Sequence, residues 1–185
     1  MSTPAEHRAT YDDLCRVPAH LVAQIIHGQL ITQPRPAPKH ARASSIMGGK
    51  LVPSYDEGSN GPGGWWILDE PELHLGSHIL VPDLAAWQRE RMPALPEKAY
   101  FDLAPDWVCE VLSPATAQMD RVDKLPLYAA QAVGHAWLVD PDAQTLEVYA
   151  LHERRWRLEC AFKAAEEVSA PPFEALRFSL AALWP

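Results

Sequence analysis

The sequence is poor in cysteine, has no long apolar run and carries few positive charges. Its three cysteines, Cys15, Cys109 and Cys160, are scattered among 185 residues and form no Cys-x-x-Cys pair. This spacing indicates neither a disulfide framework nor a thiolate zinc site, and it fits a reducing cytoplasm best. No run approaches the roughly 20 apolar residues that span a bilayer, and the first residues lack the apolar core of a signal peptide. We therefore expect a soluble, cytoplasmic protein without a membrane partner.

Positive charge is scarce and dispersed. The net charge is -8, from 24 acidic residues against 16 lysines and arginines, and there is no contiguous basic run. This balance argues against simple nonspecific binding to duplex nucleic acid, where phosphate neutralisation by Lys and Arg supplies most of the affinity. It does not exclude a nuclease, because a bound divalent cation can invert the field of an acidic site. The glycine-rich segment 58–64 lacks the Lys-Ser/Thr of a phosphate-binding loop, and we interpret it as a flexible loop.

The composition predicts one domain over residues 1–185, with residues 1–9 as a flexible N-terminus. A hydrophobic content of 48% supports one sizeable core but not two comfortable ones. Periodicity, caps and turn residues predict a short helix after a capping box at 10–13, a hairpin of strands 22–26 and 29–32, an extended connector at 34–40, a helix at 41–55, strands at 65–75, 79–87 and 106–113, a helix at 116–133, and strands at 135–140, 145–151 and 155–162. This order predicts an α/β (α+β) fold with a sheet of mixed direction.

Two carboxylates interrupt apolar strands. Asp83 follows an Ile-Leu-Val-Pro run, and Glu110 lies within Trp-Val-Cys-Glu-Val-Leu, where Val108 and Leu112 share its face by period two. A buried carboxylate needs a cation or several hydrogen-bond donors. We predict that both carboxylates face one cavity, with Lys124 on the following helix as a nearby cation. The order Pro-Asp, Glu-x-Leu and a displaced Lys suggests metal-dependent phosphodiester cleavage.

A third acid is expected beside this pair. A tight turn at residues 76–77 joins the strands 65–75 and 79–87, and the resulting antiparallel register places Glu70 directly opposite Asp83. Their Cβ atoms would lie roughly 5 Å apart, so the two charges repel unless a cation lies between them. Magnesium suits such a site because it prefers carboxylate and water oxygens. A shift of one residue in this register would replace Glu70 with Asp69 or Pro71.

Several motifs occur in an order that resembles a known family. They are Pro82-Asp83, Glu110-Val111-Leu112-Ser113-Pro114, Asp120-Arg121-x-x-Lys124-x-x-x-Tyr128 and Trp137-Leu138-Val139-Asp140-Pro141, together with Pro36-x-Pro38-x-His40 and the closing Leu-Trp. This set is similar to the Uma-two family of restriction-endonuclease-like proteins, in the PD-(D/E)XK nuclease superfamily, and it covers the chain from about Leu14 to Trp184. The resemblance implies a restriction-endonuclease-like fold, with a mixed β-sheet core flanked by helices.

The resemblance also implies an activity and assigns roles. It makes Asp83 and Glu110 metal ligands, and it makes Lys124 the migrated equivalent of the lysine usually found two residues beyond the second acid, where this chain has Leu112. The implied protein is a DNA endonuclease that uses Mg²⁺, or alternatively Mn²⁺, to activate water while a cation stabilises the developing charge. Glu70 is the expected third metal ligand. A homodimer is one expected assembly, because nucleases that cut both strands often work as symmetric dimers.

His40 and Arg121 are candidate substrate contacts. His40 falls on a family position where it would contact a phosphate, and its alternative role is to cap the following helix. Arg121 would belong to a basic strip assembled from separated residues. One departure weakens the family pattern: where relatives commonly show an acidic Glu-Leu-Ile-Asp-Gly-Glu, this chain has Gln24 and Gln29 at the two glutamate positions. An acidic contribution from the first hairpin is therefore lost.

Other interpretations remain open. Glu110 could form a buried ion pair with Arg121 or Lys124 and have no catalytic role. A competing metal site could use Glu72 and His74, which share a strand face, with His78 across the turn, but a solvated hairpin tip is the favoured interpretation. At the level of the whole protein, the alternative to an enzyme is a noncatalytic nucleic-acid-binding or assembly module that keeps the nuclease fold. The net charge and the two glutamines support that alternative.

Overall fold

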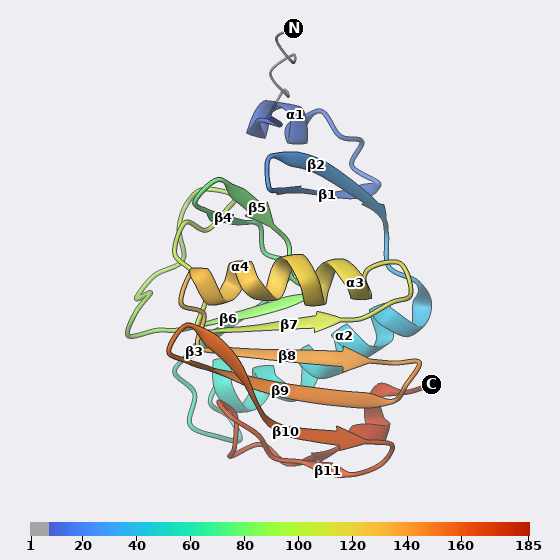
Figure 1. The fold of residues 1–185 in the computed structure, drawn as a ribbon. Coiled ribbons are helices and arrows are strands. Elements are labelled where there is room, and N and C mark those ends of the chain that lie inside the picture. Colours follow the sequence, from blue (N-terminus) through green and yellow to red (C-terminus); the bar gives the residue numbers. More distant parts are fainter. Residues whose placement is uncertain (1–7) are drawn as a thin grey trace, which may run out of the picture.

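A six-stranded mixed sheet forms the centre of the computed structural model, which describes residues 8–185 (Figure 1). Its order is β10-β9-β8-β7-β6-β3, and β7 pairs with β8 in parallel while the other neighbours pair antiparallel. The strands are β3 (Trp65–Asp69), β6 (Leu84–Gln88), β7 (Trp107–Val111), β8 (His135–Asp140), β9 (Thr145–His152) and β10 (Arg155–Lys163). The sheet of mixed direction predicted from the element order is confirmed.

A second, four-stranded sheet lies beside the first in the order β2-β1-β5-β4. It consists of β1 (Leu21–Ile26), β2 (Gln29–Pro34), β4 (Leu73–Leu75) and β5 (His78–Leu80). Gly28, with a φ of 79°, lies in the predicted turn between β1 and β2. The expectation of one long hairpin from 65–75 and 79–87 is wrong, because each half contributes one strand to each sheet.

The predicted register nevertheless continues across the break between the sheets. Leu75 pairs with His78 in one sheet and Asp69 pairs with Leu84 in the other. Between them, the backbone N–H of Glu70 donates to Asp83 O at 3.1 Å, so these two residues are opposite each other as expected. Asp83 therefore lies where the chain passes from one sheet to the other.

The helices lie beside the strands that they connect. They are α1 (Tyr11–Cys15), α2 (Pro38–Leu51) with a π-helical turn at Val52–Asp56, α3 (Ala117–Met119), the π-helical turn η2 (Asp120–Lys124), α4 (Leu125–Ala130) and the C-terminal 3-10 turn η3 (Leu180–Leu183). The predicted connector at 34–40 is too long, because α2 begins at Pro38. Proline is tolerated there, since the first turn of a helix has no intrahelical acceptor for its N–H.

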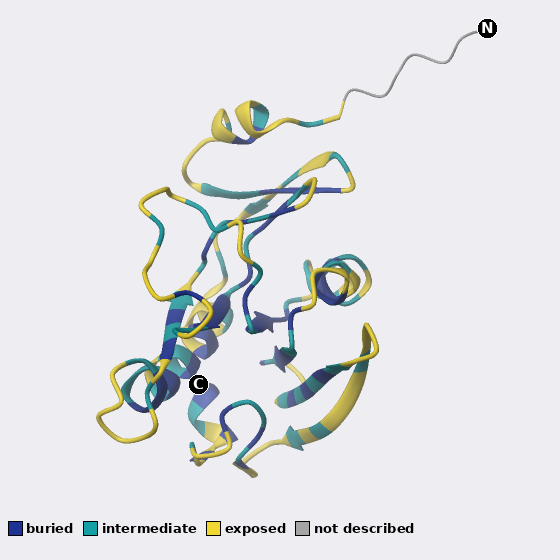
Figure 2. Ribbon diagram, turned by 90° about the vertical axis from the view of Figure 1, so that its left-hand side faces the viewer, coloured by how far each residue is buried: buried dark blue, intermediate teal, exposed yellow. Residues whose placement is uncertain are grey.

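Residues 117–130 form one continuous helical crossover between β7 and β8 (Figure 1). Parallel neighbours need such a crossover, and a helix usually provides it. The crossover covers one face of the six-stranded sheet, while α2 and the C-terminal segment, including the small ribbon β11 (Glu167–Val168) and β12 (Phe178–Ser179), cover the other. Both faces of β7 are consequently buried, and the exposed residues lie mainly on loops, on α1, on β2 and on the outer strand β10 (Figure 2).

Alternation along β7 divides its side chains between two apolar clusters. Trp107 and Cys109 belong to the cluster under α2, whereas Val108 and Leu112 belong to the cluster under the crossover helix. Glu110 follows the second set by period two, which places its carboxylate on the side of the crossover helix. Cys109 is fully buried on the opposite face, and burial raises the pKa of its thiol well above the usual value. Cys109 is therefore a packed thiol and does not line the cavity described below.

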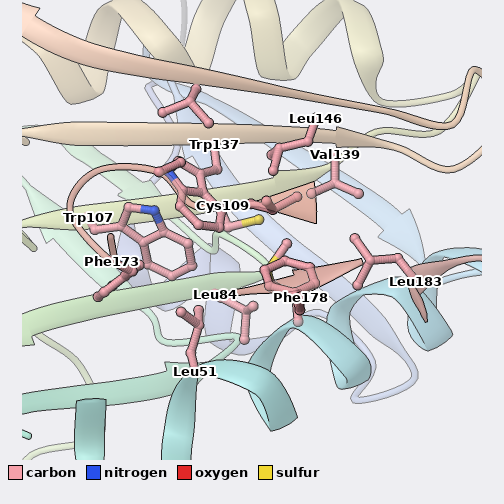
Figure 3. Close-up of a cluster of buried hydrophobic side chains, with 14 of the residues drawn as sticks. Leu51, Leu84, Trp107, Cys109, Trp137, Val139, Leu146, Phe173, Phe178 and Leu183 are labelled. Carbon is pink, nitrogen blue, oxygen red and sulfur yellow. The ribbon is translucent and has the colours of Figure 1, made fainter. Parts of the chain in front are cut away.

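Phe173 is the aromatic centre of the cluster under α2 (Figure 3). Its ring lies 4.6 Å from Tyr55 and 5.1 Å from both Trp65 and Trp107, measured between ring centroids, with edge-on geometry in each case. Such aromatic pairs contribute beyond the area that they bury. The C-terminal segment therefore completes the core of the main sheet.

Two further expectations from the sequence concern membrane-spanning segments and the N-terminus. No helix within residues 8–185 has the length and apolar character needed to cross a membrane. The flexible N-terminus was expected at residues 1–9, of which 1–7 lie outside the described residues. Ala9 donates its backbone N–H to Gly28 O at 2.8 Å, so that part of the expected flexible segment is hydrogen-bonded to the first hairpin.

Replacing Phe173 with alanine should lower the free energy of unfolding by about 3–5 kcal/mol, because the cavity removes contacts with several rings at once. Urea-induced unfolding followed by tryptophan fluorescence measures this change. Leu95→Ala is the control, because Leu95 is 44% exposed and its truncation should change stability by less than about 0.5 kcal/mol. Equal effects of the two substitutions would contradict the central packing role of Phe173.

Candidate active site

A cavity of about 680 Å³ brings the predicted site residues together. Asp83, Glu110, Lys124, His40 and Glu70 all line it. They come from the passage between the two sheets, from β7, from η2 and from the first turn of α2. The prediction that Asp83 and Glu110 face one common cavity is therefore confirmed, and Lys124 joins them there.

Asp83 is held at the point where β6 begins. Its Oδ2 accepts the backbone N–H of Val111 at 2.7 Å, and its Oδ1 lies 3.2 Å from Nε2 of His40. The β6–β7 ladder begins only at Leu84, opposite Cys109. The Asp83 carboxylate thus takes the place of a backbone acceptor for Val111, which fixes it beside the end of β7.

Glu110 and Lys124 form a buried ion pair. Lys124 Nζ lies 2.8 Å from Glu110 Oε2 and 3.2 Å from Asp120 Oδ1, and the exposed fractions of the three side chains are 4%, 2% and 3%. Lys124 also donates to Val81 O at 3.3 Å, and the Tyr128 hydroxyl donates to Glu110 Oε1 at 2.6 Å. Every oxygen of the Glu110 carboxylate therefore has a donor.

The π-helical turn places Asp120 and Lys124 on the same side of the crossover helix. They are four residues apart at its two ends, and both are buried although the neighbouring Val122 is 63% exposed. π-helical turns are rare and occur frequently at functional sites. The expectation of Lys124 as a cation near Glu110 is confirmed, and the two residues form the buried ion pair that was the other interpretation of Glu110.

Burial and mutual repulsion shift the pKa values of this cluster. Burial raises the pKa of Glu110 from 4.5 to about 8, Lys124 opposes the rise, and Asp120 and Asp83 add to it. Burial likewise raises the pKa of Asp120, again opposed by Lys124. Burial lowers the pKa of Lys124, but Glu110, Asp120 and Asp83 outweigh it and the pKa rises, so Lys124 stays charged. Two buried carboxylates thus share one ammonium, and a proton or another cation is needed to neutralise the excess negative charge.

His40 lies inside α2, not at its cap. The N-cap residue is Ala37, which makes no side-chain capping bond, so the helix-cap interpretation of His40 is wrong. The ring is held by Asp83, and its buried Nδ1 has no hydrogen-bond partner among the described residues. Burial lowers the pKa of His40, but the hydrogen bond and the charge of Asp83 outweigh this effect and raise it overall. His40 therefore lines the cavity, where Asp83 holds its ring.

Arg121 and Glu70 form ion pairs that the sequence did not predict. Arg121 donates to both carboxylate oxygens of Glu147 on β9, at 2.8 and 3.0 Å, and it does not line the cavity. Its expected contact with substrate therefore has no support in this geometry. Glu70 does line the cavity, but its Oε2 lies 3.0 Å from Arg35 Nη1, so its carboxylate already has a cation partner.

Asp120 and Tyr128 were not assigned a role from the sequence, although both stand in the Asp-Arg-x-x-Lys-x-x-x-Tyr motif. The signal for Asp120 was its i, i+4 spacing from Lys124, the separation at which helical side chains meet. Gln24 was interpreted only as a lost acid. It is buried, and its Oε1 accepts the backbone N–H of Val81 at 2.9 Å, while Val81 O accepts from Lys124. Neither Gln24 nor the exposed Gln29 lines the cavity.

The carboxylate oxygens of the cavity fit a hard cation that keeps some of its water ligands. Carboxylate oxygens of Asp83 and Glu110 face one cavity, and Mg²⁺ is commonly bound by one or two carboxylates, with water and substrate oxygens completing its coordination. Within residues 8–185, no group of three or more His, Cys, Asp and Glu side chains is arranged to hold a metal ion by itself. In the competing site, His74 and Glu72 do contact each other at 2.7 Å, but His78 does not join them, because its Nδ1 accepts from the backbone of His27.

Comparisons with known proteins agree with this geometry. Residues 8–182 match the Uma2 (Uma-two) family, which is described as "Putative restriction endonuclease". A crystal structure from Anabaena variabilis ATCC 29413, described as "a putative nuclease belonging to DUF820", is similar with a TM-score of 0.75 and 26% sequence identity, over 95% of this chain and 97% of that chain. The expected nuclease-like fold is confirmed. A comparison with curated proteins gives no match.

Glu110→Gln should make stability less dependent on pH in metal-free buffer. The folded-state pKa of about 8 lies above the ordinary 4.5, so between these values the folded protein binds more protons than the unfolded protein. Glu110 therefore contributes stability that is lost as pH rises through this range, so the loss of stability on going to high pH should be smaller by on the order of 2 kcal/mol in Glu110→Gln than in the wild type. Denaturant unfolding at about pH 5.5 and pH 8.5 measures it.

Glu153→Gln is the matched control for this experiment, because it removes one carboxylate from an exposed turn. Its pH dependence should equal that of the wild type. If Glu110→Gln and Glu153→Gln show the same pH dependence, Glu110 does not have the raised pKa that its burial implies.

Proposed function

Because this chain belongs to the Uma2 family of restriction-endonuclease-like proteins, we propose that it is a magnesium-dependent endonuclease that hydrolyses phosphodiester bonds of DNA. The observation that carries the proposal is the convergence of Asp83, Glu110 and Lys124 at one cavity. This set combines two acids that can bind a divalent cation with a cation fixed beside them. Phosphodiester hydrolysis needs both parts, one to bind metal and water and one to stabilise negative charge.

Asp83 and Glu110 would hold the metal ion. When bound, Mg²⁺ supplies an activated water and neutralises charge on the phosphate, and Mn²⁺ has a similar preference for oxygen ligands. The lining residues favour an added cation, because they include four carboxylates, Glu70, Asp83, Glu110 and Asp120, and only the two full positive charges of Arg35 and Lys124. A divalent cation would reduce this excess of negative charge. It would also favour the ionised form of Glu110, whose pKa is raised in its absence.

Lys124 would orient water or stabilise the developing charge on the phosphorane. Its ammonium is already fixed by Glu110, Asp120 and Val81 O, so little reorganisation is needed at the reaction step. Asp120 would act through Lys124, because it would still hold the ammonium if Glu110 bound a metal ion. Gln24 acts one step further away by holding the peptide of Val81.

The alternative is a noncatalytic nucleic-acid-binding or assembly module. The net charge of -8 and the negative balance of the cavity favour the assembly form of this alternative, because both repel phosphate when no metal is bound. The two functions differ in one measurement: an enzyme combines metal binding with phosphodiesterase activity that requires Asp83. A homodimer remains part of the proposal for double-strand cleavage.

Asp83→Asn should abolish magnesium binding while the protein stays folded. Asparagine keeps an oxygen that can accept the backbone N–H of Val111, but it removes the charge that attracts the cation. Isothermal calorimetry in the presence of Mg²⁺ measures binding. Asp142→Asn is the control, because Asp142 pairs with Lys39 on the surface and does not line the cavity. Unchanged magnesium affinity in Asp83→Asn would refute the assignment.

Lys124→Met should lower the cleavage rate by about 10²–10³-fold, the loss typical when one group that stabilises transition-state charge is removed. Magnesium affinity should persist, since the acids remain. Methionine fills most of the volume, but the substitution leaves two buried carboxylates without their ammonium, so thermal unfolding must accompany the assay. Lys124→Arg keeps the charge and supplies a second variant. A wild-type cleavage rate in folded Lys124→Met would exclude the role.

A further inference from the structure

A second cavity adjoins the candidate active site. It measures about 460 Å³, and its wall includes α1 and the apolar residues Leu14, Val17 and Leu21. Arg35 and Glu70 line both cavities, as do Val22 and Val81. The Arg35–Glu70 ion pair therefore lies at the boundary between the candidate active site and an adjacent cavity that Asp83, Glu110 and Lys124 do not line.

Arg35 is the one full positive charge of the cleavage cavity that a substrate can recruit. Lys124 is 4% exposed and held by two carboxylates, so its release would leave buried charges unpaired. Arg35, by contrast, is 56% exposed, and its partner Glu70 is 32% exposed. Ion pairs with this exposure contribute little to stability, so exchange of Glu70 for another anion costs little. A second contact, from Arg35 Nη2 to Ala19 O at 3.2 Å, keeps the guanidinium at the boundary.

Glu70 is fixed at this boundary by its backbone. Its φ of 44° is one that residues other than glycine adopt uncommonly, and its N–H donates to Asp83 O. The carboxylate of Glu70 thus extends from the same turn that presents Asp83, and it holds the guanidinium next to the proposed metal ligands.

We propose that Arg35 binds a backbone phosphate next to the scissile one, and that Glu70 is an internal carboxylate competitor that holds Arg35 until the phosphate replaces it. The nucleotide that carries this phosphate would lie in the second cavity. A guanidinium is suited to the role because its planar donors bind phosphate oxygens in pairs. The inference rests on the proposed function, and it assigns Glu70 a different role from that of a third metal ligand.

Removing the competitor should strengthen binding. Glu70→Gln both frees Arg35 and removes a negative charge beside the phosphate, so affinity for a short single-stranded DNA should rise about threefold to tenfold, as expected for one nearby like charge at intermediate dielectric. Arg35→Gln should weaken affinity and lower the slope of log affinity against log salt by about 1. Fluorescence anisotropy in EDTA measures both without metal or cleavage.

Glu167→Gln is the matched control. Glu167 forms an exposed ion pair with Arg177 at 3.1 Å and lines neither cavity, so this substitution makes the same change in net charge away from the site. The double variant Glu70→Gln/Arg35→Gln should lose the gain seen in Glu70→Gln. The proposal is supported if Glu70→Gln raises DNA affinity more than Glu167→Gln does, and if this rise is lost when Arg35 is also replaced.

Three results would overturn the proposal. One is an equal affinity of Glu70→Gln and Glu167→Gln, and another is a gain that persists in the double variant. The third is a loss of magnesium affinity in Glu70→Gln without any gain in DNA affinity, which would identify Glu70 as a metal ligand.

The outcomes also separate this inference from the nuclease proposal. Cleavage by the wild type with no specific gain in Glu70→Gln refutes only the role of Arg35, whereas an Arg35-dependent gain without cleavage by any variant refutes only the nuclease.

Discussion

The buried ammonium of Lys124 is the interaction on which the candidate site depends. It lies between Glu110 and Asp120, two carboxylates that would be costly to bury without it. Lys124 thereby joins the crossover helix to β7, and through Val81 O it also joins both to the passage between the two sheets. The same charge that would serve catalysis is thus needed to assemble the site.

The strands around this site impose a second constraint. β7 and β8 are parallel, so the chain must cross from the end of one to the start of the other, and the crossover helix covers the face from which Glu110 points. Asp83 lies on the neighbouring segment because the chain changes sheets there. The site therefore lies where the passage between the two sheets meets the crossover helix. For this reason, residues from distant parts of the sequence share one cavity.

Charge balance links the architecture to function. The cavity holds more carboxylates than cations, and its deepest acid has a pKa raised to about 8. This arrangement is unfavourable for phosphate alone and favourable for phosphate that arrives with a divalent cation. The half-exposed Arg35–Glu70 pair at the edge of the cavity differs from the buried pair at its centre, because the first can exchange partners at low cost and the second cannot.

The sequence by itself determined most of the helices and strands and the shared face of Glu110, Val108 and Leu112, and it favoured the register that sets Glu70 opposite Asp83. These follow from local rules, because turn geometry and the two-residue period of a strand do not depend on distant segments. Tertiary structure decided which charged groups meet. It assigned Arg121 to Glu147 and Glu70 to Arg35, brought the i, i+4 pair of Asp120 and Lys124 against Glu110, and divided one expected hairpin between two sheets. Partner choice among charged side chains depends on burial and on the meeting of segments far apart in the chain, and no local pattern contains that information.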